Sequence, residues 1–148
     1  MQNKKTIEES AIFVDVQGTL VKTRNVLDHS LYTNMQKVKQ HGAKVIIFTM
    51  ASPKNMIQQL HALGVDTKTF PVVNKSAYRG HLFTGLIVDD VAPHLQGFLA
   101  APHTYDSDGK ILSYIAKQLT ISPQLTFDKA LQNYRTMQKQ QHHINQTL

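Results

Sequence analysis

Acidic or hydroxyl side chains directly follow three short apolar segments of the sequence, and these side chains are Asp15, Thr49 and the pair Asp89 and Asp90. If the segments are neighbouring parallel strands, their carboxyl ends meet at one edge of a sheet, where such side chains lie close together. Mg²⁺ prefers oxygen ligands and is usually held by one or two carboxylates, with water and substrate phosphate completing its coordination. Together with the nearby Lys75, the pattern predicts a site for a divalent cation and a phosphoryl group.

Strand and helix signals alternate along the chain. Short runs rich in β-branched residues predict buried strands, which cover residues 11–14, 45–48, 69–73, 86–88 and 103–105. Amphipathic periodicity between capping residues predicts helices, which cover residues 28–42, 52–64 and 108–119. This alternation is typical of a three-layer, Rossmann-like α/β fold with a mainly parallel sheet of about five strands.

The first two helices have recognisable caps and inward faces. Asp28 is the expected N-cap of the first, and Gly42 is expected to end it. Ser52 and Pro53 are expected to begin the second. The predicted inward residues are Leu31, Met35 and Val38 in the first helix and Met56, Ile57, Leu60 and Leu63 in the second.

A chain of 148 residues is long enough for one domain with its own core. We assign residues 1–122 to the α/β core and residues 123–148 to a C-terminal helical tail. The tail begins with an apolar helical face that includes Phe127 and Leu131, and it ends in the polar string QKQQHHINQTL. That string buries too little apolar surface to offset its ordering entropy, so we expect the tail to be partly disordered.

Composition excludes several kinds of protein. The absence of cysteine rules out disulfides and cysteine nucleophiles. The polar start MQNKKTIEES is unlike a signal peptide, and no apolar run is long enough to span a membrane, so we expect a soluble, cytoplasmic or otherwise unanchored protein. The net charge of +6 would attract an anionic partner, but the lysines are scattered, so we do not expect nucleic acid to be that partner. Nothing in the sequence indicates an oligomeric state.

Four motifs together resemble those of the haloacid dehalogenase superfamily. The segment from Asp15 to Leu20, DVQGTL, resembles motif I, usually written DxDGT[LV]. Thr49 resembles motif II, Lys75 in VVNKS resembles motif III, and Asp89 with Asp90 resembles motif IV. The motifs occur in the family's order and span residues 11–95, with a looser resemblance to about residue 120.

The resemblance implies a role for each of these residues. Asp15 would attack phosphorus and form an aspartyl phosphate. Thr49 and Lys75 would bind and stabilise the transferring phosphoryl group, and Gly18 would allow a turn that presents backbone amides to it. The implied Mg²⁺ ligands are Asp15, the backbone carbonyl of Gln17, Asp89 and Asp90, the last directly or through water.

Gln17 departs from the family pattern, because the second aspartate of motif I is the general acid and base in most phosphatases of the superfamily. An amide cannot exchange a proton near neutral pH. We therefore expect slow turnover and a preference for aryl phosphates, whose leaving groups need less protonation. The alternative function is a catalytically weak or inactive module that binds phosphate in the same pocket.

The segments after the first and third strands are too short for a cap domain, although residues 17–28 could form a small flap. An open site suits large substrates, so we expect protein-bound phosphate such as phosphotyrosine first and small phosphorylated metabolites second.

Other interpretations of individual residues remain. Asp15 and Asp90 could be structural caps, and Lys75 could be a solvated loop lysine, with Arg79 in its place. The histidines show no metal-binding spacing, and only His94 follows closely enough on the acidic pair to lie near substrate.

Overall fold

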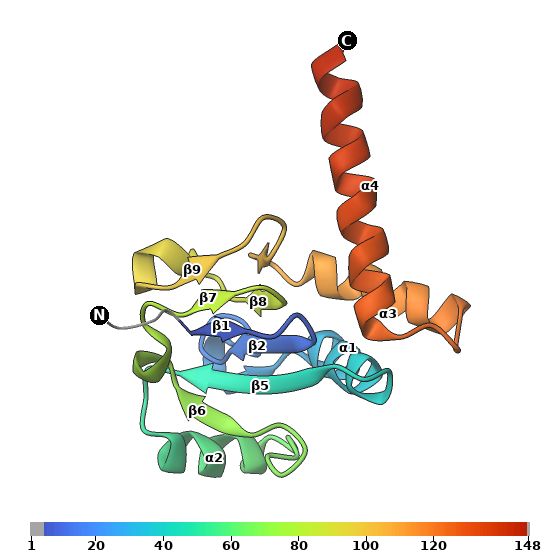
Figure 1. The fold of residues 1–148 in the computed structure, drawn as a ribbon. Helices are drawn as coiled ribbons and strands as arrows, with labels where there is room; N and C mark the ends of the chain where they lie inside the picture. Colours follow the sequence, from blue (N-terminus) through green and yellow to red (C-terminus); the bar gives the residue numbers. More distant parts are fainter. Residues whose placement is uncertain (1–4, 148) are drawn as a thin grey trace.

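A computed structural model describes residues 5–147 of the chain (Figure 1). Its centre is a sheet in the order β10-β8-β2-β5-β6, and every neighbouring pair in it is parallel. The strands are β2 (Ala11–Asp15), β5 (Lys44–Thr49), β6 (Val72–Asn74), β8 (Leu86–Val88) and β10 (Tyr105–Asp106). The predicted α/β fold, with about five mainly parallel strands, is confirmed.

One face of this sheet carries the helices. They are α1 (His29–Gln40), α2 (Pro53–Ala62), α3 (Lys110–Ile121) and α4 (Phe127–Thr147). Side chains alternate between the faces of a strand, so Ile12 and Val14 of β2 join the apolar cluster under the helices, whereas Ala11 and Phe13 point to the opposite face. β2 is therefore buried on both sides, as its unbroken apolar run predicted.

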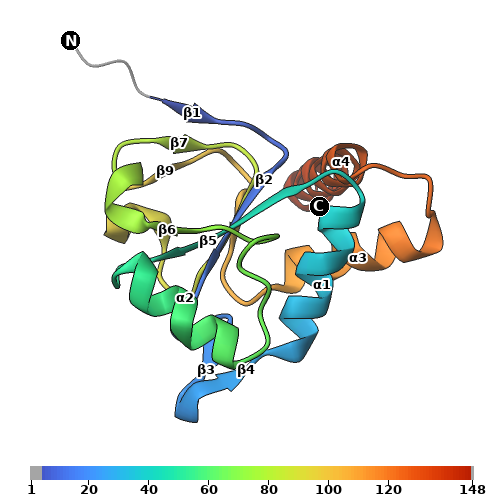
Figure 2. The same ribbon diagram turned by 90° about the horizontal axis from the view of Figure 1, so that it is seen from below.

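The opposite face is covered by a second, smaller parallel sheet in the order β1-β7-β9 (Figure 2). Its strands are β1 (Thr6–Ile7), β7 (Leu82–Phe83) and β9 (Leu99–Ala100), each two residues long. Between the two sheets lies an aromatic cluster made of Phe13, Phe48, Phe83 and Phe98. The sequence did not predict this sheet, because two residues are too few for a recognisable alternation.

The expected flap is a small antiparallel hairpin. It consists of β3 (Val21–Lys22), the 3₁₀ turn η1 (Thr23–Asn25) and β4 (Val26–Leu27). The segment between β6 and β8 holds only the 3₁₀ turn η2 (Lys75–Tyr78) and β7, and a third 3₁₀ turn, η3 (Pro93–Gln96), follows β8. Within residues 5–147, neither insertion forms a cap domain.

Some predicted boundaries and faces were wrong. β6 begins at Val72 instead of Thr69, because the Asp66 carboxylate accepts hydrogen bonds from the Thr69 backbone and hydroxyl and holds that segment in a turn. β10 begins at Tyr105 because His103 has a left-handed backbone, with φ 58°. Ile57 was expected to face inward but is 37% exposed on α2.

The long helix α4 is attached at the amino ends of the central strands. Phe127 and Leu131 are buried in the main apolar cluster. Nη2 of Arg135 donates to the carbonyls of Thr84 and Gly85, which directly precede β8, at 2.7 and 2.8 Å. Beyond this attachment α4 projects away from the body of the molecule (Figure 1).

The backbone is helical to Thr147, and partial disorder of the tail in solution stays a prediction, as does the domain boundary after residue 122. No helix in the described part of the chain is long and apolar enough to cross a bilayer.

Candidate active site

Parallel register brings the predicted acidic residues together. Val14 of β2 pairs with Val88 of β8, so the next residues along each strand, Asp15 and Asp89, lie side by side at the carboxyl edge of the sheet. One carboxylate oxygen from each of Asp15, Asp89 and Asp90 lies within 4.8 Å of the others. Asp15 and Asp89 are buried, and Asp90 is exposed. The three carboxylates fit a hard divalent cation, because they supply oxygen ligands and because their negative charges repel one another unless positive charge lies beside them.

Gly18 makes this approach possible. Its φ of 83° lies in the left-handed region, and its amide donates to the carbonyl of Val21 at 2.9 Å. A β-carbon at this position would collide with the carboxylate of Asp90. Gly18 therefore provides both the turn that the sequence predicted and the space for Asp90.

Lys75 lies between two of the three acidic residues, Asp15 and Asp89. Its Nζ is 2.8 Å from Oδ1 of Asp15 and 2.8 Å from Oδ2 of Asp89, and the side chain is buried. The ammonium group also lies 4.8 Å from the ring centroid of Phe48, a favourable cation–π position. Arg79, the alternative candidate, is exposed and forms none of the ion pairs found within residues 5–147.

Burial raises the pKa of the Asp15 carboxyl group to about 7. The negative charge of Asp89 adds to this rise, and the hydrogen bond from Lys75 opposes it. Burial alone would lower the pKa of Lys75, but its hydrogen bonds to the two carboxylates outweigh burial and raise it. Lys75 therefore stays charged, and a cation bound beside Asp15 would favour the ionised carboxylate that nucleophilic attack requires.

Two threonines flank the nucleophile candidate. Thr49 is buried at the end of β5, and its Oγ1 accepts a hydrogen bond from the amide of Ala51 at 3.1 Å, so its O–H remains able to donate. Thr19 was not predicted as a site residue. Its hydroxyl donates to Oδ2 of Asp15 at 3.1 Å and accepts from the amide of Asp90 at 3.2 Å, so it links the first and fourth motifs. Its place in the DVQGTL segment was the signal that could have identified it.

Gln96 is a second residue that sequence reasoning missed. It ends η3, and its side-chain amide contacts both Lys75 and Asp89 at 2.8 and 2.9 Å. No sequence signal marks it, because it lies in a short irregular turn seven residues after Asp89.

Gln17 and His94, two other residues singled out in the sequence, are both exposed. Gln17 is exposed two residues beyond Asp15. His94 is exposed in η3 and lines a separate groove of about 690 Å³ with Leu99 and Tyr105. Hydrogen bonds to the acidic cluster within residues 5–147 include none from His94.

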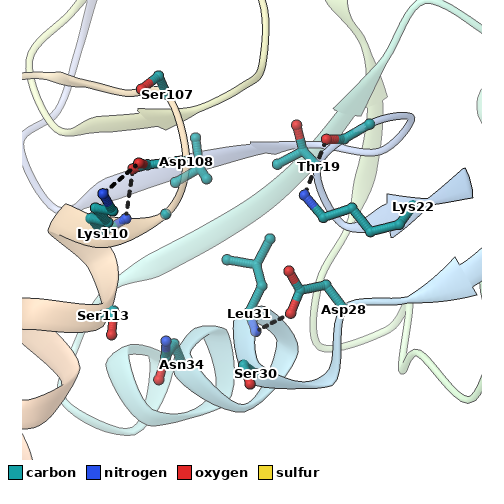
Figure 3. Close-up of a pocket in the computed structure, with 13 residues that line it drawn as sticks. Thr19, Lys22, Asp28, Ser30, Leu31, Asn34, Ser107, Asp108, Lys110 and Ser113 are labelled. Atoms are coloured by element: carbon teal, nitrogen blue, oxygen red, sulfur yellow. Dashed lines mark hydrogen bonds and ion pairs between the residues drawn. The ribbon is translucent and has the colours of Figure 1, made fainter.

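A polar pocket of about 240 Å³ adjoins the cluster at Thr19 (Figure 3). It lies between the turn after β2 and the beginnings of α1 and α3, and its wall includes Lys22, Ser30, Asn34 and Ser113. The carboxylate of Asp28 accepts from the amide of Leu31 at 3.0 Å and caps α1, as predicted, and Lys110 pairs with Asp108 at 3.5 Å. Because its lining contains two lysines and two aspartates, the pocket suits polar groups of either charge.

Comparison with protein families gives one match. The family described as haloacid dehalogenase-like hydrolase matches residues 12–145, from β2 into the end of α4. No curated protein and no solved structure matches the chain. The family match includes every acidic, lysine and threonine residue described above.

Proposed function

Since the chain belongs to the haloacid dehalogenase-like hydrolases, we propose that it is a Mg²⁺-dependent phosphatase with Asp15 as nucleophile. The observation that carries the proposal is the contact of one buried ammonium group, Lys75, with both Asp15 and Asp89 at 2.8 Å. A cation at this position neutralises a phosphoryl group and orients the attacking carboxylate at the same time.

The acidic residues are suited to hold the metal. Asp15, Asp89 and Asp90 supply three carboxylates, and the backbone carbonyl of Gln17 is the proposed fourth protein ligand. When bound, Mg²⁺ would offset the charge on the phosphoryl oxygens and lower the pKa of Asp15.

The reaction proceeds in two displacements. A carboxylate oxygen of Asp15 attacks phosphorus in line, the ester P–O bond breaks, and the leaving oxygen departs with the bonding electrons and takes a proton from water. Water then attacks phosphorus of the aspartyl phosphate, releasing inorganic phosphate and the Asp15 carboxylate. Lys75 and the Thr49 hydroxyl donate hydrogen bonds to the phosphoryl oxygens during both steps.

Gln17 in place of an aspartate favours a substrate whose leaving group departs without strong acid catalysis. An aryl phosphate meets this condition, because a phenol has a pKa of about 10, far below that of an aliphatic alcohol. The absence of a cap within residues 5–147 supports an exposed, protein-bound phosphate such as phosphotyrosine, with small phosphorylated metabolites second. The pocket beside Thr19 would receive polar groups adjacent to the phosphate.

A second candidate function is favoured by the same residue. A protein without a general acid and base can retain the phosphate pocket as a binding module, with little or no turnover. Gln17 supports this candidate, whereas the presence of Asp15, Lys75 and Asp89 in one buried cluster supports catalysis.

The test is a phosphatase screen over aryl, alkyl and acyl phosphates with Mg²⁺ or with a chelator. We expect Mg²⁺-dependent turnover that is lost in Asp15→Asn, together with loss of any acid-labile phosphoryl adduct. Mg²⁺ should also raise the melting temperature of the native protein, and Asp89→Asn should weaken this rise. Retained activity in folded Asp15→Asn protein would exclude the covalent mechanism. Phosphate binding without turnover of any ester would support the binding module.

A further inference from the structure

The side-chain amide of Gln96 makes three hydrogen bonds beside the proposed catalytic cluster. Its Oε1 accepts from Nζ of Lys75 at 2.8 Å. Its Nε2 donates to Oδ2 of Asp89 at 2.9 Å and to the backbone carbonyl of Val91 at 3.0 Å. The amide is therefore in contact with both the lysine and a carboxylate that the proposed reaction uses.

The contact with Gln96 fixes the orientation of the Lys75 ammonium group. An ammonium has three N–H donors. Lys75 donates one to Asp89 and one to Gln96, both at 2.8 Å, and its Nζ forms an ion pair with Oδ1 of Asp15 at 2.8 Å. With two donors held by Asp89 and Gln96, rotation about the terminal C–N bond is blocked, and these two bonds set the direction of the third N–H, which is left for Asp15 and the phosphoryl group.

Only one orientation of the Gln96 amide satisfies its neighbours. Reversing the amide would place its NH₂ group against the ammonium of Lys75 and its oxygen against the oxygens of Asp89 and Val91. All three hydrogen bonds would become repulsive contacts of like polarity. Asp89 and Val91 therefore fix the position of the oxygen that holds Lys75.

An amide also has the right charge for this position. A carboxylate there would add a negative charge beside Asp89 and would compete with Asp15 for the ammonium. An apolar side chain would leave one N–H of the buried Lys75 without an acceptor, at a cost in free energy.

We propose that Gln96 is a positioning residue, which aligns Lys75 with Asp15 and with the transferring phosphoryl group. The proposal rests on the proposed phosphatase function. Gln96 does not touch the reacting atoms, and it acts through Lys75.

The first experiment replaces Gln96 by Met, which has similar length and no hydrogen-bonding amide. We expect kcat for an aryl phosphate to fall about tenfold, the lower end of the range for residues that orient site ligands, with little change in KM. Gln58→Met, at an exposed position of α2, is the matched control and should leave both constants unchanged. If Gln96→Met does not fold, Gln96→Asn keeps the amide but is too short to reach Lys75, and it should show the same loss.

A double-mutant cycle with Lys75→Met distinguishes positioning from a general structural effect. In the Lys75→Met background, Gln96→Met should reduce the residual kcat by less than about twofold, because residues that act through one contact are not additive. The same tenfold loss in both backgrounds would overturn the proposal.

A measurement without metal or substrate tests the positioning itself. In protein labelled with ¹⁵N-lysine, the Lys75 ammonium should give a slowly exchanging NH₃⁺ resonance, assigned by its absence in Lys75→Met. Gln96→Met should broaden that resonance by faster exchange with water, and Gln58→Met should not. An unchanged resonance in Gln96→Met, or none in the native protein, would overturn the proposal. If the native protein hydrolyses no phosphate ester, the phosphatase function fails, while this spectrum still decides what Gln96 does.

Discussion

The two carboxylate oxygens of Asp15 have separate partners. Oδ1 accepts from the Lys75 ammonium, and Oδ2 accepts from the Thr19 hydroxyl, so the carboxylate is held from both sides. Burial nevertheless raises its pKa to about 7. A carboxyl group with this pKa is only partly ionised near neutral pH, and further positive charge beside it would favour the ionised nucleophile, which is a physical reason for metal dependence.

This pKa predicts how pH affects stability in a chelating buffer. The Asp15 pKa is raised from 3.8 to about 7 in the folded protein, so between these values the folded state binds a proton that the unfolded state has lost. Stability from this group is therefore greatest below the lower value, declines as pH rises through the interval, and is constant above about 7. We expect the free energy of unfolding to be lower at pH 8 than at pH 5, by at most about 3 kcal/mol.

Urea unfolding of native protein and Asp15→Asn, each at both pH values, would measure this effect. Groups that titrate in both proteins, such as the buried Asp106, largely cancel in the comparison. An equal pH dependence in the two proteins would show that Asp15 is ionised in the folded state without a metal.

Our second prediction for a single residue concerns Gln17, which we expect to control the selectivity between aryl and alkyl phosphates. The native protein should cleave phosphotyrosine or nitrophenyl phosphate better than phosphoserine, because a phenol leaves with less proton donation. Gln17→Asp should narrow this difference by accelerating the alkyl ester more. The ratio of kcat/KM for the two substrates is the measurement, since it reports the steps through phosphoryl transfer and not the later hydrolysis. If the ratio is the same in both folded, Mg²⁺-binding proteins, leaving-group protonation is not what position 17 controls.

At the scale of elements, the carboxyl and amino ends of the parallel strands have different roles. The carboxyl ends of β2, β5 and β8 carry Asp15, Thr49 and Asp89. The amino end of β8 receives α4 through Arg135, whose Nη2 also lies 3.2 Å from Oγ1 of Thr104, just before β10. Attachment of the C-terminal helix is thus separated from the candidate site by the length of the strands.

Removing the contacts of Arg135 should lower the stability of the fold and leave turnover unchanged. Arg135→Met removes the donors for two backbone carbonyls and the Thr104 hydroxyl. We expect the free energy of unfolding to fall by about 2–4 kcal/mol, because hydrogen bonds from a charged donor contribute about 1.5–3 kcal/mol each and the losses overlap. Urea denaturation measures the change, with Lys139→Met at an exposed position of α4 as control. Turnover of a small aryl phosphate by the folded variant should equal that of the native protein, and a specific loss of turnover would show that α4 is coupled to the site.

At the scale of the whole molecule, the site is open and α4 points away from it. The edge of the sheet with the candidate site lies at one end of the body, and α4 projects from the other (Figure 1). Only the short β3–β4 hairpin could act as a flap among residues 5–147. A large phosphorylated partner could therefore approach the acidic cluster directly.

This arrangement predicts that the end of the tail is dispensable for chemistry. Deleting residues 139–148 should leave kcat and KM for a small phosphate ester within about twofold of the native values, as for other changes that touch no part of a site. Circular dichroism of the truncated protein is the control for folding. A large loss of turnover would mean that the terminal segment reaches the site in solution and acts as a lid.

Local sequence determined which residues could do chemistry and the main elements that hold them. Asp15, Thr49 and Asp89 each follow an apolar run, and strand ends are a local property of the chain. The caps of α1 and the five parallel strands follow from the same short-range patterns, so the fold could be predicted from the sequence. Only the exact boundaries differed, because β6 and β10 begin two or three residues later than predicted.

Tertiary structure alone decided the contacts made across loops. Gln96 lies 21 residues from Lys75 and in an irregular turn, so no periodicity could predict that its amide would face the ammonium. Arg135 reaches a carbonyl 51 residues away, and the small second sheet depends on strands of two residues that exist only because their partners are brought beside them. A side chain's residue type states what it could bind, but the path of the whole chain determines which partners lie within hydrogen-bonding distance.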